Sequence, residues 1–92
     1  MAAVSRARRL PVVDEYVEDG RAAVYAENGE VVALSELASG AWAALTDDWT
    51  PVADLAEALV AEFGEPDGLD ALTATEETLR ALAEHGLAEL AD

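Results

Sequence analysis

Few side chains in this sequence could carry out chemistry, and their spacing matches none of the usual catalytic sites. His85, the single histidine, could serve as a general base or a metal ligand, but it lies where we expect a helix C-terminus. Ser35 and Ser39 lack the Gly-x-Ser-x-Gly setting of an exposed nucleophile. Because the chain has no cysteine, thiolate catalysis, disulfides and sulfur metal sites are excluded. We therefore predict that the protein is not an enzyme and uses no cofactor.

Acidic residues are frequent, but their spacing predicts surface positions. The pairs Asp47-Asp48 and Glu76-Glu77 are typical of solvated faces, not of acid/base pairs in a pocket. The segment from Asp67 to Asp70 lacks the ligand spacing of a calcium loop. We expect no metal site.

The net charge and the length of the chain exclude further classes of function. The chain has 92 residues, which is enough for one domain with a modest core, and a formal charge of −15 from 20 acidic and 5 basic residues. Such a charge repels a phosphate backbone, so we expect no nucleic-acid partner. A hydrophobic content of 52% in periodic segments favours a folded domain over acidic disorder.

We expect a flexible N-terminal tail over residues 1–10 and a single domain over residues 11–92. The tail carries three of the five basic residues but no apolar stretch long enough for a signal peptide. No segment approaches the ~20 apolar residues that a membrane-spanning helix needs. A cytoplasmic protein without membrane contact is therefore predicted.

Three short strands are predicted in the first part of this domain. The first covers Val12–Val17, and the turn composition of residues 18–21 leads into a second strand at 22–26. Asn28-Gly29 then predicts a two-residue type I′ turn, which would place Tyr25 opposite Val32 in a third strand. A small sheet of this kind must lay one face on helices.

Three helices are predicted to follow the strands. The first covers residues 36–45, with Ser35 as its cap and Gly40 where a neighbouring element should approach closely. The second begins after Thr50 as cap and Pro51 at the first helical position, and Gly64 ends it.

The third helix ends at His85-Gly86, but its start is open. Leu69 and Leu72 belong either to its first turns or to a separate turn before a capping box at Thr73–Glu76. Leu87 and Leu90 should fold back onto the core. The expected fold is therefore α+β and winged-helix-like, a three-stranded antiparallel sheet followed by three helices.

Three segments of the sequence together have a recognisable order and spacing. They are the residues Leu34-Ser35, Ala38, Ala41, Trp42 and Leu45, the second-helix segment 50–64 and the third-helix segment 79–87. They resemble the PqqD-like family, the peptide-recognition domains of peptide natural product biosynthesis known as RiPP recognition elements. The resemblance covers residues 12–90. It is carried by the order and spacing of the pieces, because the family pattern is mostly apolar spacing with one tryptophan.

The third strand also offers a physical means of binding. At the edge of a three-strand meander its outer backbone groups are unpaired, and no lysine or proline within residues 31–34 guards them. An extended peptide could add there as a further strand. The resemblance implies a groove between this strand and the third helix, lined by Val31, Val32, Ala33, Leu34, Leu72, Glu76, Leu79, Arg80 and Ala83. Three of these, Leu34, Leu72 and Leu79, are equally compatible with burial in the core.

The resemblance also implies the partners. The guest would be the leader segment of a ribosomally made precursor peptide, presented to a separate modifying enzyme such as a radical-SAM enzyme, a leader peptidase or a cyclase. The alternative is an acidic interaction or regulatory domain, a nucleic-acid mimic that binds a basic protein surface through its helices. A homodimer through the open strand edge is a further possibility. The sequence leaves the precursor, the enzyme and the product class open.

Overall fold

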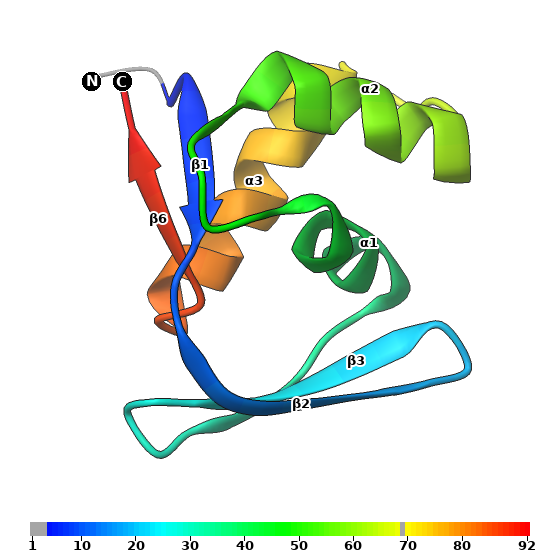
Figure 1. Ribbon diagram of the computed structural model, residues 1–92. Helices are drawn as coiled ribbons and strands as arrows, with labels where there is room; N and C mark the ends of the chain where they lie inside the picture. The colour runs from blue at the N-terminus through cyan, green and yellow to red at the C-terminus, as the bar shows by residue number, and fades with distance from the viewer. Residues whose placement is uncertain (1–3, 69) are drawn as a thin grey trace.

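The chain folds into two small antiparallel sheets and three helices (Figure 1). This computed structural model describes residues 4–68 and 70–92. The elements are β1 (Arg6–Arg9), β2 (Val12–Glu18), β3 (Arg21–Ala26), β4 (Val31–Ala33), α1 (Glu36–Ala44), β5 (Thr50–Pro51), α2 (Val52–Phe63), α3 (Ala71–Glu84) and β6 (Ala88–Ala91). The predicted α+β order, a three-stranded antiparallel sheet followed by three helices, is confirmed.

The sheet predicted from the sequence has the strand order β2-β3-β4, with antiparallel neighbours. Its first hairpin closes through Asp19 and Gly20, whose φ angles of 53° and 77° are both positive, as a type I′ turn requires. The hairpin that the sequence predicted around residues 18–21 is therefore confirmed.

The second turn differs from the predicted one. The amide of Gly29 donates to the carbonyl of Ala26, and the amide of Ala26 donates to the carbonyl of Glu30. This pattern is a three-residue loop over 27–29, in which Gly29 takes the positive φ and Asn28 does not. Tyr25 therefore lies opposite Val31, one residue from the predicted partner.

A second sheet, with strand order β5-β1-β6, was not predicted. The expected flexible tail is wrong for residues 6–9, which form β1 and pair with β6 along its whole length; residues 1–3 of that tail lie outside the described residues. Ala7 is fully buried in this strand, and the guanidinium carbons of Arg6 and Arg8 lie 4.9 and 4.7 Å from the ring centre of Trp49. Contacts between the ends of the chain thus hold β1 in place.

The helix ends agree with the sequence in part. The hydroxyl of Ser35 accepts the amide of Ala38, so the predicted cap of α1 is confirmed. Gly64 and Gly86, with φ angles of 82° and 76°, follow the ends of α2 and α3 as expected. Thr50 is not the cap of α2, because its backbone pairs with Ala7 of β1 and Pro51 takes the cap position.

The start of α3, left open by the sequence, is set by Asp70. Its carboxylate accepts the amides of Leu72 and Thr73, both at 3.3 Å. The capping box at Thr73–Glu76 is wrong, because the Thr73 hydroxyl donates to Asp70 at 2.6 Å instead. Leu69 lies outside the described residues.

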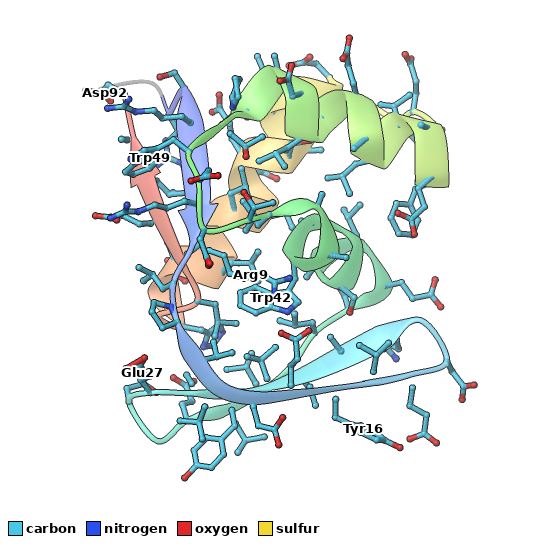
Figure 2. All side chains as sticks on the ribbon, viewed as in Figure 1. Arg9, Tyr16, Glu27, Trp42, Trp49 and Asp92 are labelled. Atoms are coloured by element: carbon cyan, nitrogen blue, oxygen red, sulfur yellow. The ribbon has the colours of Figure 1, made fainter. Side chains whose placement is uncertain are left out.

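The core lies between the β2-β3-β4 sheet and the three helices. Trp42 of α1, which is 1% exposed, is the largest fully buried side chain, and Figure 2 shows it above the sheet beside Arg9. Around it pack Val24, Val52, Leu55, Leu79, Leu82 and Leu87. Leu87 is buried and Leu90 packs against the core, as predicted.

Candidate functional site

One strand of the main sheet leaves backbone groups free. The amide of Leu34 donates to the carbonyl of Ala22, and the carbonyl of Glu30 accepts the amide of Ala26. Because successive residues of an antiparallel strand point their backbone groups to alternate sides, Val32 also bonds toward β3. Val31 and Ala33 therefore present their N–H and C=O groups to the opposite side. We call this side of Val31–Ala33 the β4 margin.

The other outer strand, β2, is less suited to pairing. Its register shifts between Val12 and Asp14, which marks a bulge. It also carries Asp14, Glu15 and Glu18 within seven residues, and bulges and charged side chains are the usual means of blunting a sheet edge. The β4 margin has neither, so it is the better docking edge of this sheet.

The strand residues of the predicted site divide between surface and core. Val31 is 70% exposed and Ala33 is also exposed, with both side chains on the outer face of the sheet. Val32 and Leu34 are buried and belong to the core cluster. A guest on the β4 margin would therefore meet the backbone of this strand more than its side chains.

Local hydrogen bonds fix the end of β4. The hydroxyl of Ser39, buried in α1, accepts the amide of Ala22 at 2.8 Å, and Ser35 caps the same helix. Ser39 thus holds α1 against the sheet, and Ser35 holds the first turn of the same helix. They set the direction in which the chain leaves β4.

The helix residues of the predicted site lie on different sides of α3. Leu79 is completely buried, and Leu72 is exposed. Arg80 and Ala83 line a shallow hollow together with Glu84 and with Leu90 of β6. Glu76 lies between Leu72 and Arg80 at helical spacing, so this flank turns toward β6. The structure therefore does not bring this flank together with β4.

The opposite flank of α3 reaches the start of β4 at its C-terminal end. Ala71, Ala74, Thr78 and His85 recur at spacings of three, four and seven residues and share one stripe. At its C-terminal end, His85 Nδ1 lies 2.8 Å from Glu30 Oε1, just before β4. At its N-terminal end, Ala71 and Ala74 face α1 and α2 across an apolar pocket. Small residues at these spacings were the signal that sequence reasoning missed.

Two titratable groups, His85 and Asp70, have structural contacts at the ends of α3. His85 contacts Glu30 and caps α3, and no group of three or more histidine, cysteine, aspartate or glutamate side chains could hold a metal among the described residues. The Thr73 hydroxyl, helped by the amides of Leu72 and Thr73, lowers the pKa of Asp70 below its ordinary value. Asp70 thus has a capping role.

Fold and site together define a small winged-helix-like α+β domain with a free strand margin. The family model for coenzyme PQQ synthesis protein D (PqqD) matches residues 20–88, and the chain belongs to this family. The match includes the whole of β4, α1, α2 and α3. No curated protein and no solved structure matches the chain closely enough to be reported. Within the described residues, none of the helices is both long and apolar enough to cross a bilayer.

Proposed function

We propose that this protein binds the leader segment of a ribosomally made precursor peptide by strand addition to the β4 margin. The observation that carries the proposal is the orientation of Val31 and Ala33, whose backbone groups face away from β3 on an uncharged edge. A guest strand there gains main-chain hydrogen bonds, each of which stabilises a complex by about 1 kcal/mol net.

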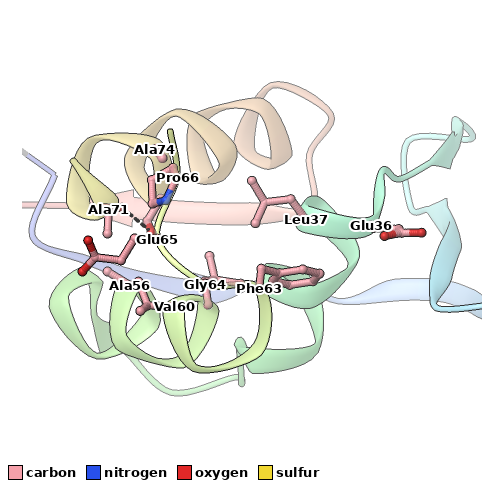
Figure 3. Close-up of a pocket in the computed structure, with 12 residues that line it drawn as sticks. Glu36, Leu37, Ala56, Val60, Phe63, Gly64, Glu65, Pro66, Ala71 and Ala74 are labelled. Atoms are coloured by element: carbon pink, nitrogen blue, oxygen red, sulfur yellow. Dashed lines mark hydrogen bonds between the residues drawn. The ribbon is translucent and has the colours of Figure 1, made fainter. Parts of the chain in front are cut away.

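The stripe of α3 that contains Ala71, Ala74 and Thr78 supports the same proposal. It lies on the side of the helix that contacts the start of β4 through His85 and Glu30. Ala71 and Ala74 line an apolar pocket (Figure 3) together with Leu37, which follows Ala33 of β4 by four residues. We therefore place the guest between the β4 margin and this stripe, and we replace the predicted Leu72, Glu76, Arg80 and Ala83 flank with it.

The role that follows is that of a non-catalytic adaptor. Membership of the PqqD family favours work alongside a separate modifying enzyme, such as a radical-SAM enzyme, a leader peptidase or a cyclase. Holding the leader raises the effective concentration of the rest of the precursor near that enzyme. The chemistry would belong entirely to the partner.

Proline substitutions on the two outer strands test the proposal. The probes are leader segments of short precursor-type peptides encoded beside this gene, labelled for fluorescence anisotropy. Ala33→Pro removes an N–H from the β4 margin, and Val17→Pro is the matched control because the Val17 amide faces the free side of β2. We expect Ala33→Pro to weaken binding at least about tenfold, which is the effect of one or two lost hydrogen bonds. Equal binding by both variants would refute strand addition to β4.

A further inference from the structure

One face of the β2-β3-β4 sheet is left uncovered by α1, α2 and α3. Figure 1 shows these helices together on the other side of the sheet. Because side chains alternate between the two faces of a strand, the residues that separate the buried Ala22, Val24 and Ala26 of β3 point to the uncovered side. We call this side the outer face. Its members are Tyr16 of β2, Ala23 and Tyr25 of β3, and Val31 and Ala33 of β4.

The outer face is both apolar and exposed. Tyr16 is 64% exposed and Val31 is 70% exposed, and Figure 2 shows Tyr16 on the side of the sheet away from the helices. Tyr25 lies directly opposite Val31, and Tyr16 lies opposite Ala23 in the next row, so the apolar side chains are continuous across the three strands. An apolar patch of this kind on the surface of a highly charged protein is typical of an interaction site.

Two shallow hollows, with volumes of about 240 and 420 Å³, lie on the outer face. Tyr16 and Ala23 line both of them, so the hollows are neighbours. Asp14 borders the first hollow, and Glu18 borders the second. A long basic side chain fits this pattern, because its aliphatic stem can lie on the alanine and on the tyrosine ring while its charged end meets the carboxylate.

The charge of this sheet selects the kind of partner. Residues 12–34, which form its strands and turns, include six acidic residues and a single basic one, Arg21. A second copy of the chain on the outer face would bring two acidic surfaces together, and like charges across an interface oppose binding. A different protein with lysine or arginine around an apolar centre is complementary, since interfaces commonly combine a tyrosine-rich centre with a polar rim.

The outer face is continuous with the β4 margin. Val31 and Ala33 belong to both, because their side chains lie on the outer face and their backbone groups face the free side of β4. A guest strand paired there would lie about 4.8 Å beyond β4, and every second side chain of the guest would join the same face. A protein bound to the outer face would therefore contact the guest as well.

We propose that the outer face binds the separate modifying enzyme, through a surface with an apolar centre and a basic rim, and that a bound leader enlarges this docking surface. The inference rests on the proposed function and names the place where the enzyme binds. The leader and the enzyme then bind cooperatively, and linkage requires each to raise the affinity of the other by the same factor. The enzyme thereby selects the adaptor that carries a leader.

Two neighbouring residues of β2 provide the test. The probe is the purified modifying enzyme encoded beside this gene, titrated into fluorescently labelled adaptor. Tyr16→Glu places a charge on the outer face, and Val17→Glu is the matched control, because Val17 is 61% exposed but lies opposite the buried Ala22 on the other face. We expect Tyr16→Glu to weaken enzyme binding at least about tenfold and Val17→Glu less than about twofold. Unchanged binding by Tyr16→Glu, or equal losses in both variants, would overturn the proposal.

A milder variant covers the case in which Tyr16→Glu does not fold. Tyr16→Ser removes the exposed ring without adding charge, and we expect it to weaken enzyme binding at least about threefold. Full affinity of Tyr16→Ser in that case would overturn the proposal. So would a wild-type adaptor that does not bind the enzyme, with or without the leader.

The leader segment alone, without the part of the precursor that is modified, tests the cooperativity. At saturating leader, the affinity of the enzyme for the wild type should rise at least about fivefold. Ala33→Pro should bind the enzyme as the free wild type does and should show no such rise. An equal affinity of the wild type with and without leader would contradict the enlarged docking surface.

The two proposals fail separately. Tyr16→Glu should bind the leader normally, because β2 lies two strands away from the β4 margin. Normal leader binding by Ala33→Pro, together with loss of the enzyme in Tyr16→Glu, would remove strand addition and keep the outer face. Loss of the leader in Ala33→Pro, with full enzyme binding by Tyr16→Glu, would remove the outer face and keep strand addition.

Discussion

The guanidinium of Arg9 joins three segments of the chain. It lies 3.9 Å from the ring centre of Trp42, donates to the Trp42 carbonyl at 2.6 Å and contacts Glu15 of β2 at 3.2 Å. Its Nε and the Trp42 indole nitrogen are buried without a hydrogen-bond partner, so the site is not fully satisfied. The stacking and the fork of donors nevertheless make arginine hard to replace here.

We predict that Arg9→Met lowers the free energy of unfolding by about 2 kcal/mol, the combined effect of a charged hydrogen bond and a cation–π contact. Arg9→Lys should lose most of the same amount, because lysine cannot both stack and donate to the carbonyl. Urea denaturation measures both, with Arg21→Met, on an exposed residue, as control. If Arg9→Lys were as stable as the wild type, the positive charge at this position, and not the stacking and hydrogen bonding of arginine, would account for the stabilisation.

Asp70 gives the protein a pH-dependent helix cap. Its pKa lies below the ordinary value of 3.8 because the Thr73 hydroxyl and two amides bind the ionised form. The folded state thus holds the proton less tightly than the unfolded state. The contribution is fully present above pH 3.8 and is lost as the pH falls below it through the folded pKa.

We predict that Asp70→Asn, which keeps a capping side chain without a titrating group, removes this dependence. The stability of the wild type relative to Asp70→Asn should decline only below about pH 4, in thermal unfolding from pH 6 to pH 3. Comparing the two proteins cancels the effect of the other carboxylates. A difference that is constant over this range would contradict the assignment of Asp70 as an ionised cap.

At the scale of elements, β4 has two sides with opposite sensitivity to proline. Val32 bonds toward β3, whereas the amide of Ala33 faces the free side. Val32→Pro should therefore destabilise the fold by at least about 1 kcal/mol through the lost ladder bond, and more if β4 detaches. Ala33→Pro should cost clearly less. Urea denaturation measures the free energy of unfolding of both variants. Equal losses of stability would mean that the register between β3 and β4 differs from the one described.

The ends of the helices could be predicted from the sequence, because the residues that cap a helix act on backbone groups only a few positions away. Ser35, Gly64 and Gly86 each act within one helix turn, and all three have the predicted place. The two-residue turn predicted at Asn28-Gly29 was wrong. A glycine with positive φ fits both a two-residue and a three-residue hairpin loop, and this protein has the three-residue loop. The register of β4 followed from that choice.

Two features of the structure could not be predicted from the sequence, because they depend on contacts between residues far apart in the chain. β1 pairs with β6, more than 75 residues away, and its Arg-Ala-Arg-Arg sequence has no apolar alternation. The flank of α3 that contains Ala71, Ala74 and Thr78, on which we place the guest, was also missed. Leu72, Glu76, Arg80 and Ala83 share a face, but only the packing of Leu79, Leu82 and β6 decides where that face points.

At the scale of the whole molecule, the charge of −15 should govern the rate at which peptides arrive. We predict that the association rate of a lysine-containing leader peptide falls at least about threefold between ~20 and ~200 mM salt, with little change in dissociation. Stopped-flow fluorescence measures both rates. A peptide with glutamine in place of lysine is the control, and an unchanged association rate for the lysine peptide would argue against steering.

The most direct test of the central claim is a titration of the ¹⁵N-labelled protein with those leader segments, followed through its backbone amides. Binding by strand addition should concentrate the shifts and the protection from exchange at Val31 and Ala33, with neighbouring changes along the Ala71, Ala74 and Thr78 stripe of α3. The amides of β2 should stay unchanged. Shifts confined to the acidic outer faces of the helices, with β4 unaffected, would contradict the account and favour an acidic interaction domain instead.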